Sequence, residues 1–365
     1  MRIVIAPDSF KGTVSAQEAA DLIGSGIRQA VSGTDCANNL EIIAIAMADG
    51  GEGTAAAFHG EQITLPTTDA NGRLTEASYV YDDATHTAFI DVAAASGLPQ
   101  VIDDLRPLTA DTFGTGVLIA DAQTRGATRI TLGLGGSATT DGGTGILAAL
   151  GASPLSATGY ALQPGGAALR DLDSIDTAQL NIPAAAMEWV LLADVVNPAT
   201  GPTGSAATFG PQKGASSEDI AALDAGISRL CEVCEIDPTT PGMGAAGALA
   251  VGITWLSTLM HGTSSHVHLL PGAAVVAEAT GLAEYIADAD CVITGEGRLD
   301  SQSLSGKVVG EVLKLTHGTP VIVVTGQSLI SPPAQATVLE LIDADPQAQF
   351  IDAGHRIAAL LNVSQ

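Results

Sequence analysis

Short apolar runs alternate along the chain with loops rich in glycine and polar residues. Ile3 to Ala6 is apolar, a polar loop follows it, and Ser15 can cap a helix that carries Glu18 at its third position. A second apolar run, Leu40 to Ala46, leads into the glycine-rich loop 47–54. Apolar strands followed by glycine-rich turns and helices predict a parallel sheet, whose ligands bind beyond the carboxyl ends of the strands.

The pattern changes between residues 62 and 92, where threonines alternate with apolar residues. Asn71-Gly72 is a hairpin signal between Leu65 and Tyr79, so this stretch is predicted to be antiparallel. A helical pattern returns at 114–125. Four further strands are predicted at Arg129–Leu132, Trp189–Ala193, Ala289–Thr294 and Pro320–Thr325.

These elements predict an α/β fold with two domains. A discontinuous parallel α/β domain is expected from residues 1–61 plus 271–365, with a mixed α/β domain, residues 62–270, inserted into it. The last forty residues carry no recognisable motif.

The composition of the chain is that of an acidic globular protein with a large apolar core. The chain has 365 residues, 46% of them hydrophobic and only 15% charged, which is enough to bury a large core in two domains. Its 14 basic and 40 acidic residues give a net charge of −26, so nucleic acid and anionic membranes are not expected partners. Every apolar run is too short to cross a bilayer, and a soluble protein is expected.

Cysteine usage favours the cytoplasm. The chain has four cysteines, and only Cys231 and Cys234 have the spacing of a metal or redox motif. A zinc site would need a second close pair, which the sequence lacks. Reduced thiols are therefore expected, and these suit a cytoplasmic protein.

Lysine is rare in this chain, and its placement is informative. Lys11, Lys213 and Lys307 each adjoin a glycine in a loop, whereas Lys314 has the position of an ordinary helix-surface residue. Such lysines can bind a phosphate or a carboxylate as compact charges. The alternative is that they stabilise helix ends.

Acidic residues follow several of the predicted strands. Asp8, Asp49, Asp194 and Asp300 each come close after an apolar run, so a parallel sheet would place them at its ligand-binding edge. Four acids at one edge suggest a cation, and Mg²⁺ takes one or two carboxylates together with phosphates and waters. For any single Asp, capping of the next helix is an equally good explanation.

The segment from Gly133 to Gly143 is rich in bare backbone amides and hydroxyls, which suits a phosphate. A dinucleotide fingerprint is a weaker interpretation, because no acidic residue lies about twenty positions further on. A standard P-loop is excluded, since Val308 follows Lys307 where Ser or Thr is required. The residues alone thus indicate phosphoryl transfer to a small hydroxylated anion.

Six motifs taken together resemble the first family of bacterial glycerate kinases. They cover about residues 1–326 and are Ala6-Pro-Asp-Ser-Phe-Lys-Gly12, Met47-Ala-Asp-Gly-Gly-Glu-Gly-Thr54, Gly133-Leu-Gly-Gly-Ser-Ala-Thr-Thr-Asp-Gly-Gly143, Asp194-Val-Val-Asn-Pro198, Phe209-Gly-Pro-Gln-Lys-Gly214 and Ile293-Thr-Gly-Glu-Gly-Arg-Leu-Asp-Ser-Gln302. The resemblance implies ATP-dependent phosphorylation of D-glycerate with Mg²⁺, mostly at the 2-hydroxyl to give 2-phosphoglycerate. It also implies two α/β domains, the discontinuous one Rossmann- or flavodoxin-like, with the active site in the cleft between them.

Other outcomes stay open at this point. They are a kinase that yields 3-phosphoglycerate or acts on a related sugar acid, and a non-catalytic sensor of sugar acids or nucleotides. The expected partners are D-glycerate and ATP, with a homodimer as an option.

The resemblance and the loop chemistry together assign roles to individual residues. Lys11 and Arg298 are expected to hold the glycerate carboxylate or the transferring phosphoryl group, and Asp194 and Asp300 to serve Mg²⁺ and the attacking hydroxyl. Substrate contacts are expected from Asp8, Ser9, Lys11, Asp49, Gly50 and Arg298. Nucleotide contacts are expected from Gly135, Gly136, Ser137, Ala138, Thr139, Asp141, Lys213 and Glu296.

The chain departs from the family's pattern in two places. Val117 stands where family members often have Glu, and the chain is expected to diverge after Gly326. If the family's C-terminal helix closes the nucleotide site, the divergence would lower activity.

Overall fold

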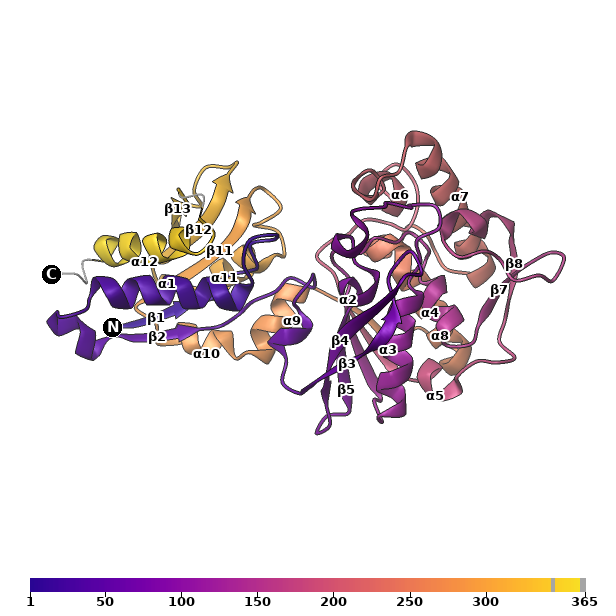
Figure 1. Cartoon of the computed structure of the whole chain (residues 1–365), viewed down its shortest axis with the longest axis horizontal. Coiled ribbons are helices and arrows are strands. Elements are labelled where there is room, and N and C mark those ends of the chain that lie inside the picture. The colour runs from indigo at the N-terminus through magenta and orange to yellow at the C-terminus, as the bar shows by residue number, and fades with distance from the viewer. Residues whose placement is uncertain (343–344, 362–365) are drawn as a thin grey trace. The chain divides into compact units, whose positions relative to one another are not determined.

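A computed structural model describes residues 1–342 and 345–361 (Figure 1). Its contacts divide the chain into a first unit, Met1–Asp49 with Pro271–Gln365, and a second unit, Gly50–Leu270. The sequence pattern predicts the first boundary at residue 61 instead. Residues 53–55 join the second unit because the amides of Gly53 and Ala55 donate to the buried carboxylate of Asp91, at 2.8 and 3.0 Å.

The first unit is built on a parallel sheet of five strands in the order β13-β12-β11-β1-β2. The strands are β1 Arg2–Ile5, β2 Glu41–Ala44, β11 Cys291–Leu299, β12 Val321–Ser328 and β13 Ala336–Glu340. Its helices are α1 Ala16–Ala30, α9 Gly272–Ala279, α10 Leu282–Ala287, α11 Val308–Leu315 and α12 Ala348–Leu360, with the 3₁₀ turn Asp35–Asn39. The predicted parallel α/β arrangement is confirmed.

Helix α1 begins where the sequence predicts, because the Ser15 hydroxyl accepts the amide of Glu18 at 3.2 Å. Its apolar face packs against α12, and the two helices lie side by side in Figure 1. Two glycines allow this close approach, since a Cβ on Gly26 would lie 2.1 Å from the Ile351 carbonyl oxygen and one on Gly354 2.3 Å from that of Ile23. Helix α12 was not predicted from the sequence.

The second unit contains a mixed sheet of six strands in the order β10-β9-β6-β5-β4-β3. The strands are β3 Glu61–Thr68, β4 Leu74–Asp82, β5 Thr87–Asp91, β6 Arg129–Gly133, β9 Glu188–Leu192 and β10 Val267–Leu270. Pairing is antiparallel from β3 to β5 and parallel from β5 to β10. The predicted hairpin at Asn71-Gly72 is confirmed, with Gly72 at φ +78°.

The helices of the second unit are α2 Val92–Ser96, α3 Phe113–Thr124, α4 Thr144–Ala149, α5 Ile182–Ala185, α6 Ser205–Phe209, α7 Ser217–Cys234 and α8 Ala245–His261. Short 3₁₀ turns are Ala55–Ala57, Pro99–Val101, Gly166–Asp171 and Pro211–Lys213, and a separate ribbon pairs β7 Ser153–Ser156 with β8 Leu172–Asp176.

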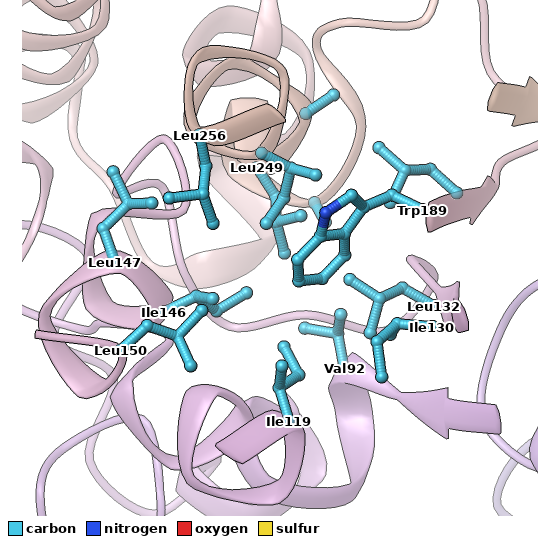
Figure 2. Packing of buried hydrophobic residues seen from close by; sticks show 14 of the residues in the cluster. Val92, Ile119, Ile130, Leu132, Ile146, Leu147, Leu150, Trp189, Leu249 and Leu256 are labelled. Atoms are coloured by element: carbon cyan, nitrogen blue, oxygen red, sulfur yellow. The ribbon is translucent and has the colours of Figure 1, made fainter. Parts of the chain in front are cut away.

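The core of the second unit forms around Trp189, which is fully buried (Figure 2). Leu132 of β6 and Leu249 of α8 lie close to its indole ring in this view. The core thus fixes β6 and β9, and the loops that leave the carboxyl ends of these two strands contain Gly133–Gly143 and Asp194. None of the helices in the described ranges has the length and apolarity needed to span a bilayer. The thiols of Cys231, Cys234 and Cys291 are buried and free.

Candidate active site

In the first unit, a crevice forms where the order of the sheet reverses. The chain leaves β1 through α1 toward β2, whereas it leaves β11 through α11 toward β12 on the other side. Loops that diverge from neighbouring parallel strands leave room for a ligand. A pocket of about 470 Å³ lies there, lined by Asp8, Ser9, Phe10, Lys11, Thr13, Glu296, Gly297, Arg298, Asp300, Gln302, Lys307, Gly326, Leu341 and Gln349. We refer to it below as the switch-point pocket.

The loop after β1 is anchored by the aromatic ring of Phe10. This ring is buried and meets Phe350 edge to face, with 4.7 Å between ring centroids. The backbones of Phe10 and Val14 exchange hydrogen bonds of 3.0 and 3.1 Å, which close the loop. Ser9 and Lys11, on either side of this anchor, line the pocket.

Asp8 and Glu296 line the switch-point pocket, and Asp49 lies beside Lys307, which also lines it. All three carboxylates are more than nine-tenths buried. Burial, together with the negative charges of Asp49 and Glu296, raises the pKa of Asp8 to about 7, although Lys11 opposes the shift. Burial also raises the pKa of Glu296, and its Oε1 atom has no hydrogen-bond partner among the described residues. A carboxyl with a pKa near 7 can accept or release a proton at neutral pH.

The cations of this pocket are Lys11, Arg298 and Lys307. Arg298 is largely exposed, and its Nε lies 3.4 Å from Oδ2 of Asp300. The ammonium of Lys307 lies 3.5 Å from Oδ2 of Asp49. The sequence marks Lys307 as one of three loop lysines beside a glycine but does not assign it to the site, so the structure adds it.

The structure corrects the prediction for residues 295–299. The sequence predicts a glycine-rich loop there, whereas β11 continues to Leu299 and pairs with β12 as far as Ser328. Gly295 permits this pairing, because a Cβ at that position would lie 2.3 Å from the Val324 carbonyl oxygen. Glu296 and Arg298 are therefore held on a strand rather than on a loop.

In the second unit, the carboxylate of Asp141 holds the segment from Gly133 to Gly143, which we call the phosphate loop. It is fully buried and accepts hydrogen bonds from the Thr112 amide and hydroxyl, at 2.9 and 2.7 Å, and from the amides of Gly143 and Gly145. These bonds tie the loop to the starts of α3 and α4. The sequence assigns Asp141 to nucleotide contact, and the structure gives its oxygens partners within the protein.

Lys213 supports the same loop from the opposite side. Its ammonium is buried and donates to the Ser137 hydroxyl at 3.1 Å and to the Thr139 carbonyl at 2.5 Å. Burial lowers the pKa of Lys213 to about 8, and the charge of Asp141 opposes the shift. The ammonium of Lys213 thus bonds to the loop itself.

Backbone bonds fix the remainder of the phosphate loop. Gly135 donates to Gly50, Ala138 donates to Ser96, and Gly136 accepts from Leu98, all at 2.8–2.9 Å. Within the described ranges, no acceptor pairs with five of the loop's amides, those of Gly136, Ser137, Thr139, Thr140 and Asp141. The hydroxyls of Thr139 and Thr140 are also buried without a partner among these residues. Together these donors match the acceptor oxygens of a phosphate.

Asp194 and Gly50 also belong to the second unit. Asp194 follows β9, and Gly50 adopts φ +94°, where a Cβ would lie 2.7 Å from the Leu192 carbonyl oxygen. Asp300 lies in the first unit, so a shared role of Asp194 and Asp300 at Mg²⁺ stays a prediction. Within residues 1–342 and 345–361, no three His, Cys, Asp or Glu side chains are arranged to hold a metal ion.

The model of the glycerate kinase family matches residues 3–344. The chain belongs to the glycerate kinase family. It is 40% identical over 356 residues to "Glycerate kinase" of Bacillus subtilis (strain 168), covering 94% of this chain and 89% of that protein. It is also 40% identical over 339 residues to "Glycerate 2-kinase" of Escherichia coli (strain K12), covering 89% of this chain and 85% of the relative.

A solved glycerate kinase structure has the same fold. The crystal structure of a Salmonella typhimurium LT2 protein assigned as glycerate kinase 2 superposes with a TM-score of 0.79 at 35% sequence identity, and the match covers 99% of this chain and 98% of that one. The family match reaches residue 344, so the expected end of the resemblance at residue 326 is wrong. Strand β13, Ala336–Glu340, lies within the matched region and extends the sheet of the first unit.

Proposed function

We propose that this protein catalyses ATP-dependent phosphorylation of D-glycerate on its 2-hydroxyl, which yields 2-phosphoglycerate and ADP. Membership of the glycerate kinase family and the name of the Escherichia coli relative, glycerate 2-kinase, support the reaction and the position. The observation that carries the proposal is that the chain offers both kinds of group that phosphoryl transfer needs. These are a pocket with cations and carboxyls and a separate loop with unpaired donors.

The acceptor substrate is assigned to the switch-point pocket. Lys11 and Arg298 supply positive charge for the glycerate carboxylate or the transferring phosphoryl group, and Asp8 and Ser9 also line the pocket. Asp49 and Gly50, which do not line it, are the other residues that we assign to the substrate. Asp194 and Asp300 are assigned to Mg²⁺ and the attacking hydroxyl. Asp8 is a further candidate for the base, because it is buried at the pocket and its pKa lies at about 7.

The phosphates of ATP are assigned to the phosphate loop. Gly135, Gly136, Ser137, Ala138 and Thr139 present its backbone, and Asp141 and Lys213 hold that backbone in place. Donors that are already fixed before the ligand binds stabilise developing charge without rearrangement, and phosphoryl transfer depends mainly on such positioning.

The carboxylates present suit Mg²⁺, which needs only one or two protein oxygens beside phosphates and water. Glu296 adds a buried oxygen without a partner among the described residues. When bound, the ion would neutralise charge on the phosphates. We assign Glu296 to the nucleotide side of the reaction, with Asp194 and Asp300 as the predicted ligands. A cytoplasmic location and a homodimer also stay predictions.

The test is ADP formation from MgATP with D-glycerate, compared with L-glycerate and with no acceptor. We expect ADP release that depends on D-glycerate. ADP release that is equal with and without D-glycerate would contradict the proposal, and calorimetric binding of glycerate without turnover would favour a non-catalytic sensor.

A further inference from the structure

Lys307 occupies the inner edge of the switch-point pocket, at the start of α11. Its ammonium lies 3.5 Å from Oδ2 of Asp49 and its side chain is 29% exposed, whereas Asp49 is almost completely buried. The backbone that carries Lys307 is firmly held, because its carbonyl accepts the amide of Glu311 at 2.9 Å. The preceding turn is closed as well, since the Ser303 hydroxyl accepts the amide of Asp300 and the Ser303 carbonyl accepts that of Gly310.

The three cations of the pocket face different acids. The charge of Lys11 lowers the pKa of Asp8, and Arg298 lies beside Asp300. Lys307 faces the two remaining carboxylates, since it lies beside Asp49 and its charge lowers the pKa of Glu296, which Asp49 raises. Removing Lys307 would therefore take a positive charge away from two buried carboxyl groups.

An anionic substrate makes this compensation necessary. Glycerate carries a carboxylate, and a pocket wall with uncompensated carboxylates would repel it, because like charges a few ångströms apart interact strongly away from bulk water. Lys11 and Arg298 attract the substrate from the more exposed side of the pocket, since both are exposed. The positive charge of Lys307 instead compensates the buried acids Asp49 and Glu296.

We propose that Lys307 is a positioning residue that sets the affinity of the switch-point pocket for small hydroxycarboxylates by neutralising Asp49 and Glu296. This inference rests on the proposed function for the identity of the substrate. It assigns a role to a lysine that lies outside the six motifs shared with the glycerate kinases.

The chain offers a matched control on the same helix. Lys314 also lies on α11, its side chain is 60% exposed, and its ammonium is paired with Glu311 at 3.0 Å, away from the pocket. Lys307→Met and Lys314→Met therefore remove the same group from the same helix. Lys307→Arg keeps the charge and serves as the rescue variant.

The kinetic test compares these three variants with the unmodified protein. For Lys307→Met we expect KM for D-glycerate to rise roughly tenfold to a hundredfold, as for a lost interaction with a charged group, and KM for ATP to rise less, because only Glu296 of the two acids is assigned to the nucleotide. Lys307→Arg should recover most of the affinity, and Lys314→Met should match the unmodified protein. An unchanged KM for D-glycerate in Lys307→Met would overturn the proposal, as would an equal rise for ATP.

A second readout needs no substrate and separates this inference from the proposed function. The charged groups that act on Glu296 include Asp8, Asp49, Asp300 and Lys307. Without Lys307 the folded-state pKa of Glu296 rises further, so the stability that the protonated carboxyl contributes is lost as pH rises through it. Thermal unfolding should show Lys307→Met losing stability relative to Lys314→Met as the pH is raised from acid towards neutral.

A stability difference between the two variants that does not change with pH would overturn the electrostatic role of Lys307. If the unmodified protein forms no ADP with D-glycerate, the proposed function fails while this readout still decides the role of Lys307.

Discussion

Asp8 lines the pocket, and its pKa suits proton transfer near neutral pH. Its Oδ1 accepts the Ser9 amide at 2.7 Å, and burial raises its pKa to about 7. If Asp8 is the base, it acts deprotonated, so kcat/KM should rise with pH and level off above about pH 7. Asp8→Asn should lower kcat by about 100-fold or more, measured as ADP formation across pH.

Asp21→Asn is the control for this substitution, because Asp21 lies on the exposed face of α1. It should leave the profile unchanged. A profile of Asp8→Asn that keeps both the height and the acid limb of the unmodified protein would exclude Asp8 as the base and leave Asp194 and Asp300.

Lys213 shows how burial makes stability depend on pH. Its pKa is about 8 in the folded protein, below that of an exposed lysine, so the unfolded chain holds this proton at pH values where the folded protein has released it. The contribution of Lys213 to stability therefore rises with pH between about 8 and about 10.5, by on the order of 1–3 kcal/mol, and stays constant at lower pH, where both states hold the proton.

The measurement is urea unfolding of Lys213→Met, the unmodified protein and Lys314→Met at several pH values. Relative to Lys213→Met, the unmodified protein should gain stability across this pH range, and Lys314→Met should behave like the unmodified protein. If the free energy of unfolding changed with pH in the same way in all three proteins, this would contradict the effect of burial on the Lys213 ammonium.

The sequence identifies many of the site's side chains but not all of their partners. Asp8 was found because it follows an apolar strand and Lys11 because it is a rare lysine beside a glycine, and both line the pocket. Asp141 and Lys213 lie in the expected loops, yet their charged groups bond to the protein itself. Whether such a side chain contacts a ligand or the protein's own loop depends on contacts between distant segments, which spacing along the chain does not reveal.

Among the elements, a left-handed turn at the start of α8 supports the phosphate loop. Ala246, Gly247 and Ala248 have φ values of +48°, +73° and +63°. The Gly247 carbonyl accepts the Gly142 amide at 2.9 Å, and a Cβ on Gly247 would lie only 2.2 Å from the Thr139 carbonyl oxygen. The turn therefore fits against the loop only with glycine at its centre.

Gly247→Ala should displace the loop and destabilise the protein. We expect a loss of about 3 kcal/mol or more, because backbone atoms must move in addition to the cost of a positive φ. KM for ATP should rise. Gly262→Ala is the control, since Gly262 ends the same helix at φ +70° with nothing near its missing Cβ, and it should cost only about 1 kcal/mol.

Urea unfolding and initial-rate kinetics measure these two effects. Equal losses of stability for Gly247→Ala and Gly262→Ala, with unchanged KM for ATP, would show that the contact with the loop is unimportant.

Sequence patterns predict the elements that carry their own signals. The Ser15 cap of α1 and the Asn71-Gly72 hairpin are determined by neighbouring residues, and both are confirmed. The extension of β11 to Leu299 and helix α12 were not predicted. Each of these depends on a partner far along the chain, β12 for the strand and α1 for the helix.

At the scale of the whole molecule, the net charge of −26 dominates the electrostatics. Self-repulsion destabilises a folded protein of high net charge, and salt screens it, since the Debye length falls from about 30 Å at 0.01 M to about 3 Å at 1 M. The melting temperature should therefore rise by at least about 2 °C between low and high NaCl.

Differential scanning calorimetry tests this, with sucrose of equal osmolality as the uncharged control. A melting temperature that falls with NaCl, or that rises equally in sucrose, would show that charge repulsion does not limit stability.

The central claim is that the chain transfers the γ-phosphoryl group of ATP to the 2-hydroxyl of D-glycerate. Phosphorus NMR of the product formed from MgATP and D-glycerate tests this most directly. The account predicts the signals of ADP and 2-phosphoglycerate, formed in equal amounts. A 3-phosphoglycerate signal would contradict the assigned position, and ADP with free phosphate as the only products would contradict glycerate as the acceptor.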